Sequence, residues 1–342
     1  MKNKIVFLLL ILLLLCGCKN NKSNNELNVL NWSSYIPDEV IRDFEKKYDI
    51  KVNYSTYSSN EELLAKISSS KDGTYDLIFP SDYMIEIMKN RNMLEKLDTS
   101  KLTNFNNLNK DYLSLPFDKD NEYSLPFLYA TVVLAVNKDY IKEEITSYND
   151  LINSKYKNNI VLIDDQRFVI GMSLLANGYS LNSTNKDELK TAQKWLEKLK
   201  TNIKAYDSDS PKNFLITEEA YIGYIWDAEA KLAKLENPNI EIIRPKEGVG
   251  ISLDNYAIPR GAKNTNNAYK FIDYLLDSKV MHQILEGYPY NSVNIATDLE
   301  YSSEFMYDAN FIGIDYDNNQ KYFVENIGDY IKDYDKLWAE IK

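Results

Sequence analysis

Apolar and polar residues in the first third of the chain follow a rhythm typical of strands alternating with helices. Apolar or alternating runs at 27–32, 50–57 and 75–80 predict strands, and the segments 37–48, 59–71 and 81–94 have apolar residues at helical spacing. This order predicts parallel strands with helices on both faces of the sheet. The rhythm returns between 159 and 245, after a long apolar strand at 128–139. The pattern favours a discontinuous two-lobe α/β protein.

The start of the chain has the features of an export signal. Lys2 and Lys4 precede an unbroken apolar run, 5–15, that is too short to span a bilayer comfortably. The run ends in "LCGC", which resembles the cleavage site of bacterial lipoproteins, with Cys18 as the acylated residue. We therefore expect a signal peptide at 1–17, a lipidated Cys18 and a flexible linker at 18–26. An ordinary cleaved signal is the alternative.

Charge and motif content narrow the function classes. The net charge of −11 makes nucleic acid an unlikely partner. The chain has no phosphate-binding glycine loop and no nucleophile elbow, and its one histidine, His282, lies in an ordinary helix pattern. With no cysteine beyond Cys18, we expect no metal site and no cofactor. The sequence thus predicts a binding protein rather than an enzyme.

Aromatic and acidic residues recur where predicted strands end. The positions are Trp32 and Tyr35; Ser81, Asp82 and Tyr83; Asp164 and Asp165; Trp226 and Asp227; and Asp254 in a predicted crossing strand. Ligands of open parallel sheets bind outside the carboxyl ends of the strands, so these side chains can converge in one crevice. Carboxylates pair with ammonium groups, and aromatic faces attract cations. This combination suits an elongated polyamine.

Eight segments, in order, resemble one family. They are "LNWSSYIP", "YSTYSSNEELLAKI", "DGTYDLIFPSDY", "SKLTNFNNL", "YSLPFLYAT", "GYIWDAEA", "PKEG" and "AIPRGAKN". Together they resemble the periplasmic spermidine/putrescine-binding proteins of ABC importers (PotD-like proteins), from about Leu27 to Gly328. The resemblance implies a two-lobe periplasmic-binding-protein fold of type II, with three crossings and hinge closure. It implies an N-terminal lobe of 27–131 plus 255–297 and a C-terminal lobe of 132–254 plus 298–342.

The resemblance also implies a ligand site and partners. The residues that match the family's site are Trp32, Ser33, Tyr35, Ser81, Tyr83, Asp165, Ser208, Trp226, Asp254 and Tyr288, to which the strand-end pattern adds Asp82. The expected partners are putrescine or spermidine and the subunits of an ABC permease. The expected protein is a monomer outside the cytoplasm, held to the cell membrane through its lipid anchor.

Two positions depart from the spermidine-binding pattern. Phe168 stands where spermidine binders of this family carry a glutamate, and Ser252 stands where they carry a tryptophan. The first change removes a charge partner for one amine, which favours putrescine over spermidine. Asp82 or Asp227 could supply a replacement carboxylate, which keeps spermidine open. A receptor for another small cationic amine, and a carboxylate-dependent extracytoplasmic hydrolase, are the alternatives.

Overall fold

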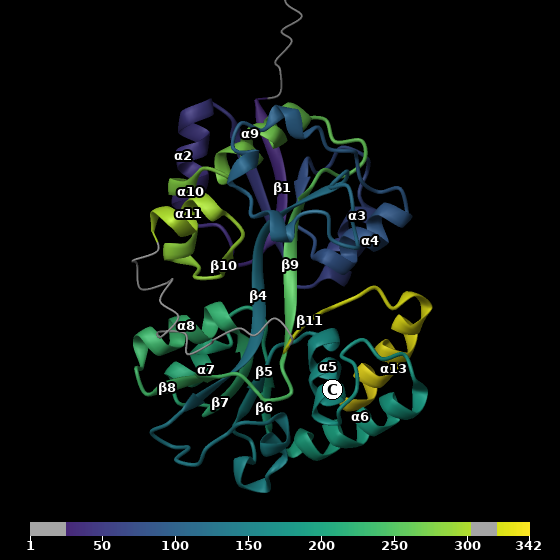
Figure 1. Ribbon diagram of the computed structural model, residues 1–342, viewed down its shortest axis with the longest axis vertical. Helices are drawn as coiled ribbons and strands as arrows, with labels where there is room; N and C mark the ends of the chain where they lie inside the picture. Colours follow the sequence, from purple (N-terminus) through teal and green to yellow (C-terminus); the bar gives the residue numbers. More distant parts are fainter. Residues whose placement is uncertain (1–24, 302–319) are drawn as a thin grey trace, which may run out of the picture.

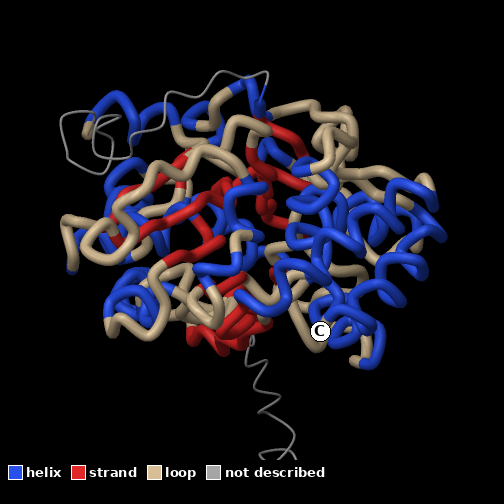
Figure 2. Tube along the Cα trace, turned by 90° about the horizontal axis from the view of Figure 1, so that it is seen from below, coloured by secondary structure: helices blue, strands red, loops and turns tan. Residues whose placement is uncertain are grey.

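The computed structural model describes residues 25–301 and 320–342. Figure 1 shows two lobes stacked along the long axis of the molecule. Two strands, β4 (Ser124–Asn137) and β9 (Val249–Ala257), run from one lobe into the other. Figure 2, seen from below, shows helices on both sides of the strands. The two-lobe α/β architecture predicted from the sequence is confirmed.

The upper lobe in Figure 1 is built mainly from the first third of the chain and from residues after β9. Its strands are β1 (Glu26–Trp32), β2 (Lys51–Tyr57), β3 (Leu77–Ile78) and β10 (Asn291–Ser292). Its helices are α2 (Asp38–Tyr48), α3 (Asn60–Ser69), α4 (Asp82–Asn90), α9 (Thr265–Leu275), α10 (Ser278–Gly287) and α11 (Ile295–Glu300). Three 3-10 turns, η1 (Thr99–Lys101), η2 (Phe105–Asn107) and η3 (Lys110–Tyr112), lie in the segment before β4.

The lower lobe is built from the middle of the chain and the C-terminal segment. Its strands are β5 (Ile160–Leu162), β6 (Ile203–Tyr206), β7 (Ile222–Trp226), β8 (Ile240–Ile243) and β11 (Lys321–Phe323). Its helices are α5 (Gln166–Ala176), α6 (Lys186–Leu199), α7 (Lys212–Ile216), α8 (Asp227–Glu236) and α13 (Ile331–Ile341). The 3-10 turns are η4 (Tyr148–Ile152), η5 (Ser154–Tyr156), η6 (Lys200–Asn202) and η9 (Gly328–Tyr330).

One path of paired strands, in the order β2-β1-β3-β9-β4-β7-β5-β6, passes through both lobes. The pairs β1–β2, β1–β3, β5–β7 and β5–β6 are parallel, whereas β4 and β9 are antiparallel to their neighbours on this path. The first half of β4 pairs with β9, and its second half pairs with β7 and β8. Every residue of β4 except Tyr129 is buried. A strand that is covered on both faces needs apolar side chains along most of its length, and the sequence of β4 is accordingly apolar at most positions.

The helices cover the sheet through the apolar stripes that the sequence predicts. Ala268, Phe271, Ile272 and Leu275 of α9 are all buried, as their spacing requires. In α2 the buried residues are Val40, Ile41 and Phe44, and the helix follows Pro37, which lacks the N–H that a first turn leaves unpaired. These stripes fix the helices against the strands that carry the site.

Strand β3 is much shorter than the predicted strand 75–80, because side chains take over its backbone bonds. The carbonyl oxygen of Phe79 accepts hydrogen bonds from Trp32 Nε1 at 3.0 Å and from the Tyr57 hydroxyl at 2.6 Å. Ser81 then forms an isolated bridge to Asp254 in β9. The chain after β3 is thus held at the junction of the lobes.

Helix α6, remote from that junction, offers a test of local stability. Asn185 caps its N-terminus, with Oδ1 accepting from the N–H groups of Asp187 and Glu188. We expect Asn185→Ala to lower the free energy of unfolding by about 1 kcal/mol, because two N–H groups lose their acceptor. Urea denaturation measures the loss. Asn185→Asp should keep the cap, and an equal loss in both variants would contradict this role.

The boundaries of the two lobes along the sequence depend on where the chain passes between them for the third time. Helix α11 contacts α10 and η2 in the upper lobe and continues to Glu300, three residues beyond the predicted boundary at 297. The connection to β11 in the lower lobe runs through residues 302–319, outside the described residues, as do the predicted signal peptide and Cys18. The division into lobes stays a prediction at this point. Within 25–301 and 320–342, no helix is long and apolar enough to cross a membrane.

Candidate functional site

A cavity lies between the lobes, at the carboxyl ends of strands from both. Trp32 is the last residue of β1, and Trp226, the last residue of β7, pairs with Val132 near the middle of β4. The residues that line the cavity are Trp32, Ser33, Tyr35, Ser58, Asn60, Ser81, Ala130, Asp165, Phe168, Ser208, Trp226, Ser252, Asp254 and Tyr290. Its volume is about 50 Å³, which is room for a few water molecules. A larger ligand can enter only if the lobes move apart.

The upper wall of the cavity is aromatic. Trp32 lies against Tyr57, with ring centroids 4.5 Å apart, and its indole N–H is fixed by Phe79. Tyr35, which is 4% exposed, packs against Tyr290 at 4.6 Å. The turn between Trp32 and Tyr35 includes Ser34, whose φ is 53°, so the chain reverses sharply there. These rings present a rigid apolar face to the cavity.

Asp254 lies on the crossing strand β9 and is 4% exposed. Its Oδ1 accepts a hydrogen bond from the Ser81 hydroxyl at 2.6 Å, and its Oδ2 accepts one from the Tyr35 hydroxyl. Ser252 and Asn60 both donate to Ser81, at 3.0 and 3.1 Å. Burial raises the pKa of Asp254 to about 6, against the opposing effect of these hydrogen bonds. A cation beside this carboxylate would favour its charged form.

The lower wall carries a second aromatic pair. Trp226 is half-buried, and Phe168 of α5 packs edge-on against it, with centroids 4.9 Å apart. Phe168 is 3% exposed and lies close over Gly250, where an added Cβ would approach its ring to 2.8 Å. The ring therefore has little freedom to move, and it closes this side of the cavity.

Asp165 brings a second carboxylate to the cavity from the lower lobe. It caps α5, with Oδ1 accepting from the N–H groups of Arg167 at 2.8 Å and Phe168 at 3.2 Å. Burial and the nearby charge of Glu61 raise the pKa of Asp165 to about 6, although both N–H groups act to lower it. Ser208 accepts a bond from the neighbouring Asp164 N–H at 2.9 Å. Asp165 and Asp254 are the only acids among the lining residues of this cavity.

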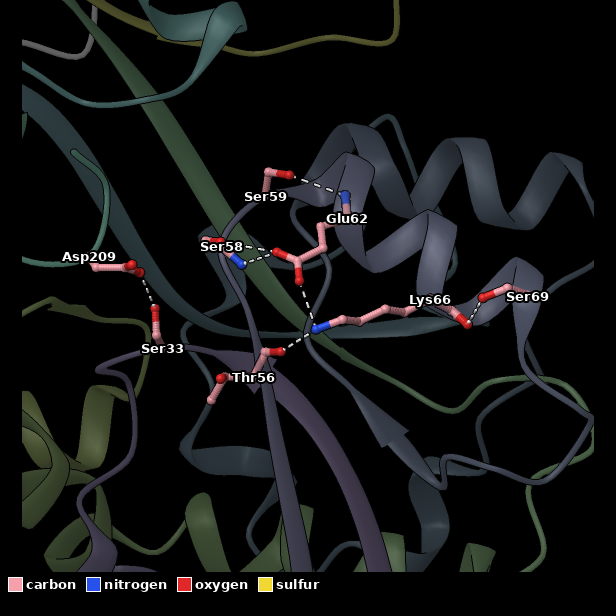
Figure 3. A network of polar contacts seen from close by, with 8 residues as sticks. All are labelled: Ser33, Thr56, Ser58, Ser59, Glu62, Lys66, Ser69 and Asp209. Atoms are coloured by element: carbon pink, nitrogen blue, oxygen red, sulfur yellow. Dashed lines mark hydrogen bonds and ion pairs between the residues drawn. The ribbon is translucent and has the colours of Figure 1, made fainter. Parts of the chain in front are cut away.

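A hydrogen bond joins the two lobes beside the cavity, and a polar network within the upper lobe fixes the cavity edge. Figure 3 shows the Ser33 hydroxyl donating to Asp209 Oδ1 across the lobes, at 2.9 Å. It also shows Glu62 accepting from Ser58 and pairing with Lys66 at 2.7 Å, which fixes Ser58 at the cavity edge. The structure is therefore a closed arrangement.

A buried network on α8 strengthens this junction. Lys231, 2% exposed, donates to the Pro289 carbonyl at 2.8 Å, beside Tyr290. Asp227 is fully buried and accepts from Asn291 Nδ2 at 2.6 Å and from the Thr131 hydroxyl at 3.1 Å. These bonds join the lower-lobe helix to the segment that carries Tyr290.

The structure brings most of the predicted site residues together. Trp32, Ser33, Tyr35, Ser81, Asp165, Ser208, Trp226 and Asp254 all line the cavity. Sequence reasoning missed Ser58, Asn60, Ala130 and Tyr290, and it treated Phe168 and Ser252 only as departures. Ser58 and Asn60 could have been found, because they follow the carboxyl end of β2 as Trp32 follows β1.

Three predicted residues lie off this cavity. Asp82 and Tyr83 begin α4 and face a different cleft, because the chain turns away from the cavity after Ser81. Tyr288 ends α10 with its N–H bonded to Ile284, and the next turn places Tyr290 on the cavity instead. Asp227, considered as a replacement carboxylate, is committed to the Asn291 and Thr131 bonds.

A second, wider and acidic pocket of about 580 Å³ adjoins the cavity and shares Ser58, Asp165 and Ser208 with it. The acids that line it are Glu61, Asp164, Asp165, Asp207, Asp209 and Asp335. Lys342 partly offsets this charge by pairing with Asp164 at 2.6 Å. A negative vestibule of this kind attracts cations toward the cavity. In the described part of the chain, no group of three or more His, Cys, Asp or Glu side chains could hold a metal ion.

Comparison with known proteins assigns the family. Residues 39–311 match the model of the bacterial extracellular solute-binding proteins. The spermidine/putrescine-binding periplasmic protein of Escherichia coli is 41% identical over 274 residues, covering 80% of this chain and 79% of the relative. A solved structure from Listeria monocytogenes, of a protein assigned to spermidine/putrescine ABC transport, has a TM-score of 0.88 and 34% identity, covering 93% of this chain and 98% of the other.

A lipoprotein has the same architecture. The Tp0655 (TpPotD) lipoprotein of Treponema pallidum has a TM-score of 0.81 and 25% identity, covering 93% of this chain and 99% of the other. The two lobes and the crossing strands are therefore those of a type II periplasmic-binding-protein fold. The chain belongs to the family of bacterial extracellular solute-binding proteins.

Proposed function

We propose that the protein captures a small polyamine, putrescine above all, between its lobes and delivers it to an ABC permease. The observation that carries this proposal is the pair of carboxylates, Asp254 on the crossing strand and Asp165 in the lower lobe, which line one cavity between aromatic walls. Two acids in one cavity, Asp254 buried and Asp165 half-buried, match a ligand with two ammonium groups. The polyamine-binding names of the relatives support the same ligand class.

Each wall has a defined part in this proposal. One ammonium group pairs with Asp254, whose Oδ atoms are already oriented by Ser81 and Tyr35. The other pairs with Asp165, which α5 holds in place. The methylene chain between them lies against the rings of Trp32 and Trp226, which cover apolar surface and attract cations. Affinity then comes from closing the lobes over the ligand.

The number of acids favours a diamine. Asp82 and Asp227, the two residues that could have supplied a third carboxylate, do not line the cavity. Phe168 closes the lower wall with an apolar ring. A third ammonium group in this cavity would thus lack an acidic partner.

Spermidine is the second candidate, because the vestibule adjoins the cavity. A longer amine held by Asp165 could extend past Ser58 and Ser208, which line both spaces, toward Asp207 and Asp209. That route places the third ammonium group in a wider and more solvated pocket, where a charge pair is worth less than in the buried cavity.

Isothermal titration with putrescine, cadaverine, spermidine and spermine tests the proposal. We expect putrescine to bind the cavity about tenfold more tightly than spermidine does, since only two acids line it. Equal or tighter binding of spermidine would favour the vestibule route. Absence of heat with all four amines would exclude a polyamine receptor.

The proposed role needs no catalysis. We propose that the protein works as a monomer that opens and closes, and not as a hydrolase, in keeping with its relatives, which are named as binding and transport proteins. We further propose that Cys18 carries the lipid that keeps the receptor at the outer side of the cell membrane. The "LCGC" sequence and the lipoprotein relative support this anchor.

A further inference from the structure

A second cleft between the lobes, of about 410 Å³, shares no residue with the cavity described above. Its upper side is formed by the start of α4 and by residues 115–117, and its lower side by residues 323–326. In Figure 1 the yellow segment after β11 runs toward the side of α3 and α4 before it reaches α13. The cleft is thus bounded by elements from both lobes.

Asp82 lies in this cleft, and only one of its two carboxylate oxygens accepts a hydrogen bond. Its side chain is 2% exposed, and its Oδ1 accepts from the Tyr83 N–H at 2.8 Å. Its buried Oδ2 has no partner within hydrogen-bond distance, although the backbone N–H of Leu253 lies near enough to act against the rise in the pKa of this carboxyl. An unpaired buried acceptor is costly, and native structures contain few of them. Burial and the nearby charge of Asp254 raise the pKa of Asp82 well above its usual range.

The remaining lining suits an organic cation. Glu86, which is half-buried, and Glu325, which is exposed, add two carboxylates. Leu115, Phe117 and Phe323 supply apolar and aromatic surface, which covers methylene groups and attracts ammonium ions. A hydrated metal ion would gain little from contact with apolar walls of this kind.

The neighbouring cations donate hydrogen bonds to other groups, although Nε of Arg167 is buried without a partner. The guanidinium of Arg167 lies 5.5 Å from the Tyr83 ring centroid and donates to the Glu325 carbonyl, and its charge only partly opposes the effect of burial on Asp82. The ammonium of Lys89 donates to the Phe117 carbonyl. Three carboxyl groups therefore line the cleft, and the ammonium group of Lys89, at its wall, donates to a carbonyl and not to one of them.

We propose that this cleft binds one small primary ammonium ion, with Asp82 Oδ2 as its buried acceptor and Glu86 and Glu325 at its mouth. The occupant would contact both lobes, so its binding favours the closed arrangement described here. This second site is separate from the proposed polyamine cavity, because the two have no lining residue in common, although the charge of Asp254 acts on Asp82.

Titration of the protein with n-butylammonium chloride, followed by backbone amide NMR shifts, tests the site. All samples carry Asp254→Asn, so that a response does not depend on the polyamine cavity. We expect saturable shifts at Tyr83, Glu86 and residues 323–326. The dissociation constant should rise at least tenfold in Asp82→Asn and less than threefold in the exposed control Asp120→Asn.

A second variant covers the case in which Asp82→Asn does not fold. Leu115→Trp, at the half-buried rim, should fill the cleft and abolish the butylammonium shifts while the amide spectrum stays dispersed. Unsaturable or absent shifts at these amides would overturn the proposal, as would an unchanged dissociation constant in a folded Asp82→Asn or Leu115→Trp protein. Loss of tight putrescine binding in a protein with native Asp254 that still shows the saturable butylammonium shifts would count only against the polyamine cavity.

Discussion

Replacing Asp254 with alanine should cost on the order of 2–5 kcal/mol of putrescine binding, which is about 30-fold to several thousand-fold in the dissociation constant. The cost is large because the change leaves a buried ammonium group without its acceptor. It also removes the acceptor of the Ser81 and Tyr35 hydroxyls, which orient the site. Isothermal titration of the variant against the unmodified protein measures the difference.

Two controls separate binding from folding. Asp254→Asn keeps the shape and one carbonyl acceptor, so it should lose affinity through charge alone. Asp76 is equally buried but holds Asn28, Lys263 and Asn264, away from the cavity. Asp76→Asn should lower the midpoint of urea unfolding and leave putrescine affinity within about twofold. Unchanged affinity in Asp254→Ala would remove this residue from the binding site.

The strand-end rule predicted which residues line the cavity wherever regular structure positions a side chain. Trp32 ends β1, Trp226 ends β7, and Asp165 follows β5, and all three line the cavity. The parallel strands of both lobes point their carboxyl ends at the junction, so a linear pattern suffices to bring these residues together.

The rule was insufficient where an irregular turn decides the direction of a side chain. Ser81 and Asp82 are neighbours, yet Ser81 bonds to Asp254 and Asp82 faces the other cleft. Tyr290 reaches the cavity because Asn291 pairs with Tyr129 of β4, a contact 162 residues away. The spacing of apolar and polar residues near these positions predicts neither outcome. Both depend on where the crossing strands lie.

In the proposed function, the same crossing strands couple ligand binding to closure. Asp254 is on β9, and Tyr290 precedes β10, which pairs with β4. Tyr290 is also joined to the lower lobe through Lys231 and the Pro289 carbonyl. A ligand that contacts Asp254 and Tyr290 thus touches the hinge itself, whereas Asp165 is carried by the moving lobe. In the arrangement described here, both carboxylates line the one cavity.

Putrescine affinity should fall about 100-fold between pH 7.5 and pH 5. The pKa values of Asp165 and Asp254 are both about 6 without ligand, and a diamine binds their ionised forms. Below pH 6 each carboxyl must lose a proton before binding, which costs about tenfold per group at pH 5. Titration calorimetry in a buffer series of constant ionic strength measures the change, together with the protons released.

The unliganded protein should show the opposite trend. The pKa of each carboxyl is higher in the folded chain than in the unfolded chain, so their contribution to stability decreases as the pH rises from about 4 to above 6. Asp165→Asn should reduce the affinity change between pH 7.5 and pH 5 to about tenfold, because one titrating group remains. A pH-independent affinity in the unmodified protein would mean that neither carboxylate meets an ammonium group, and it would contradict the pairing of both acids with the ligand.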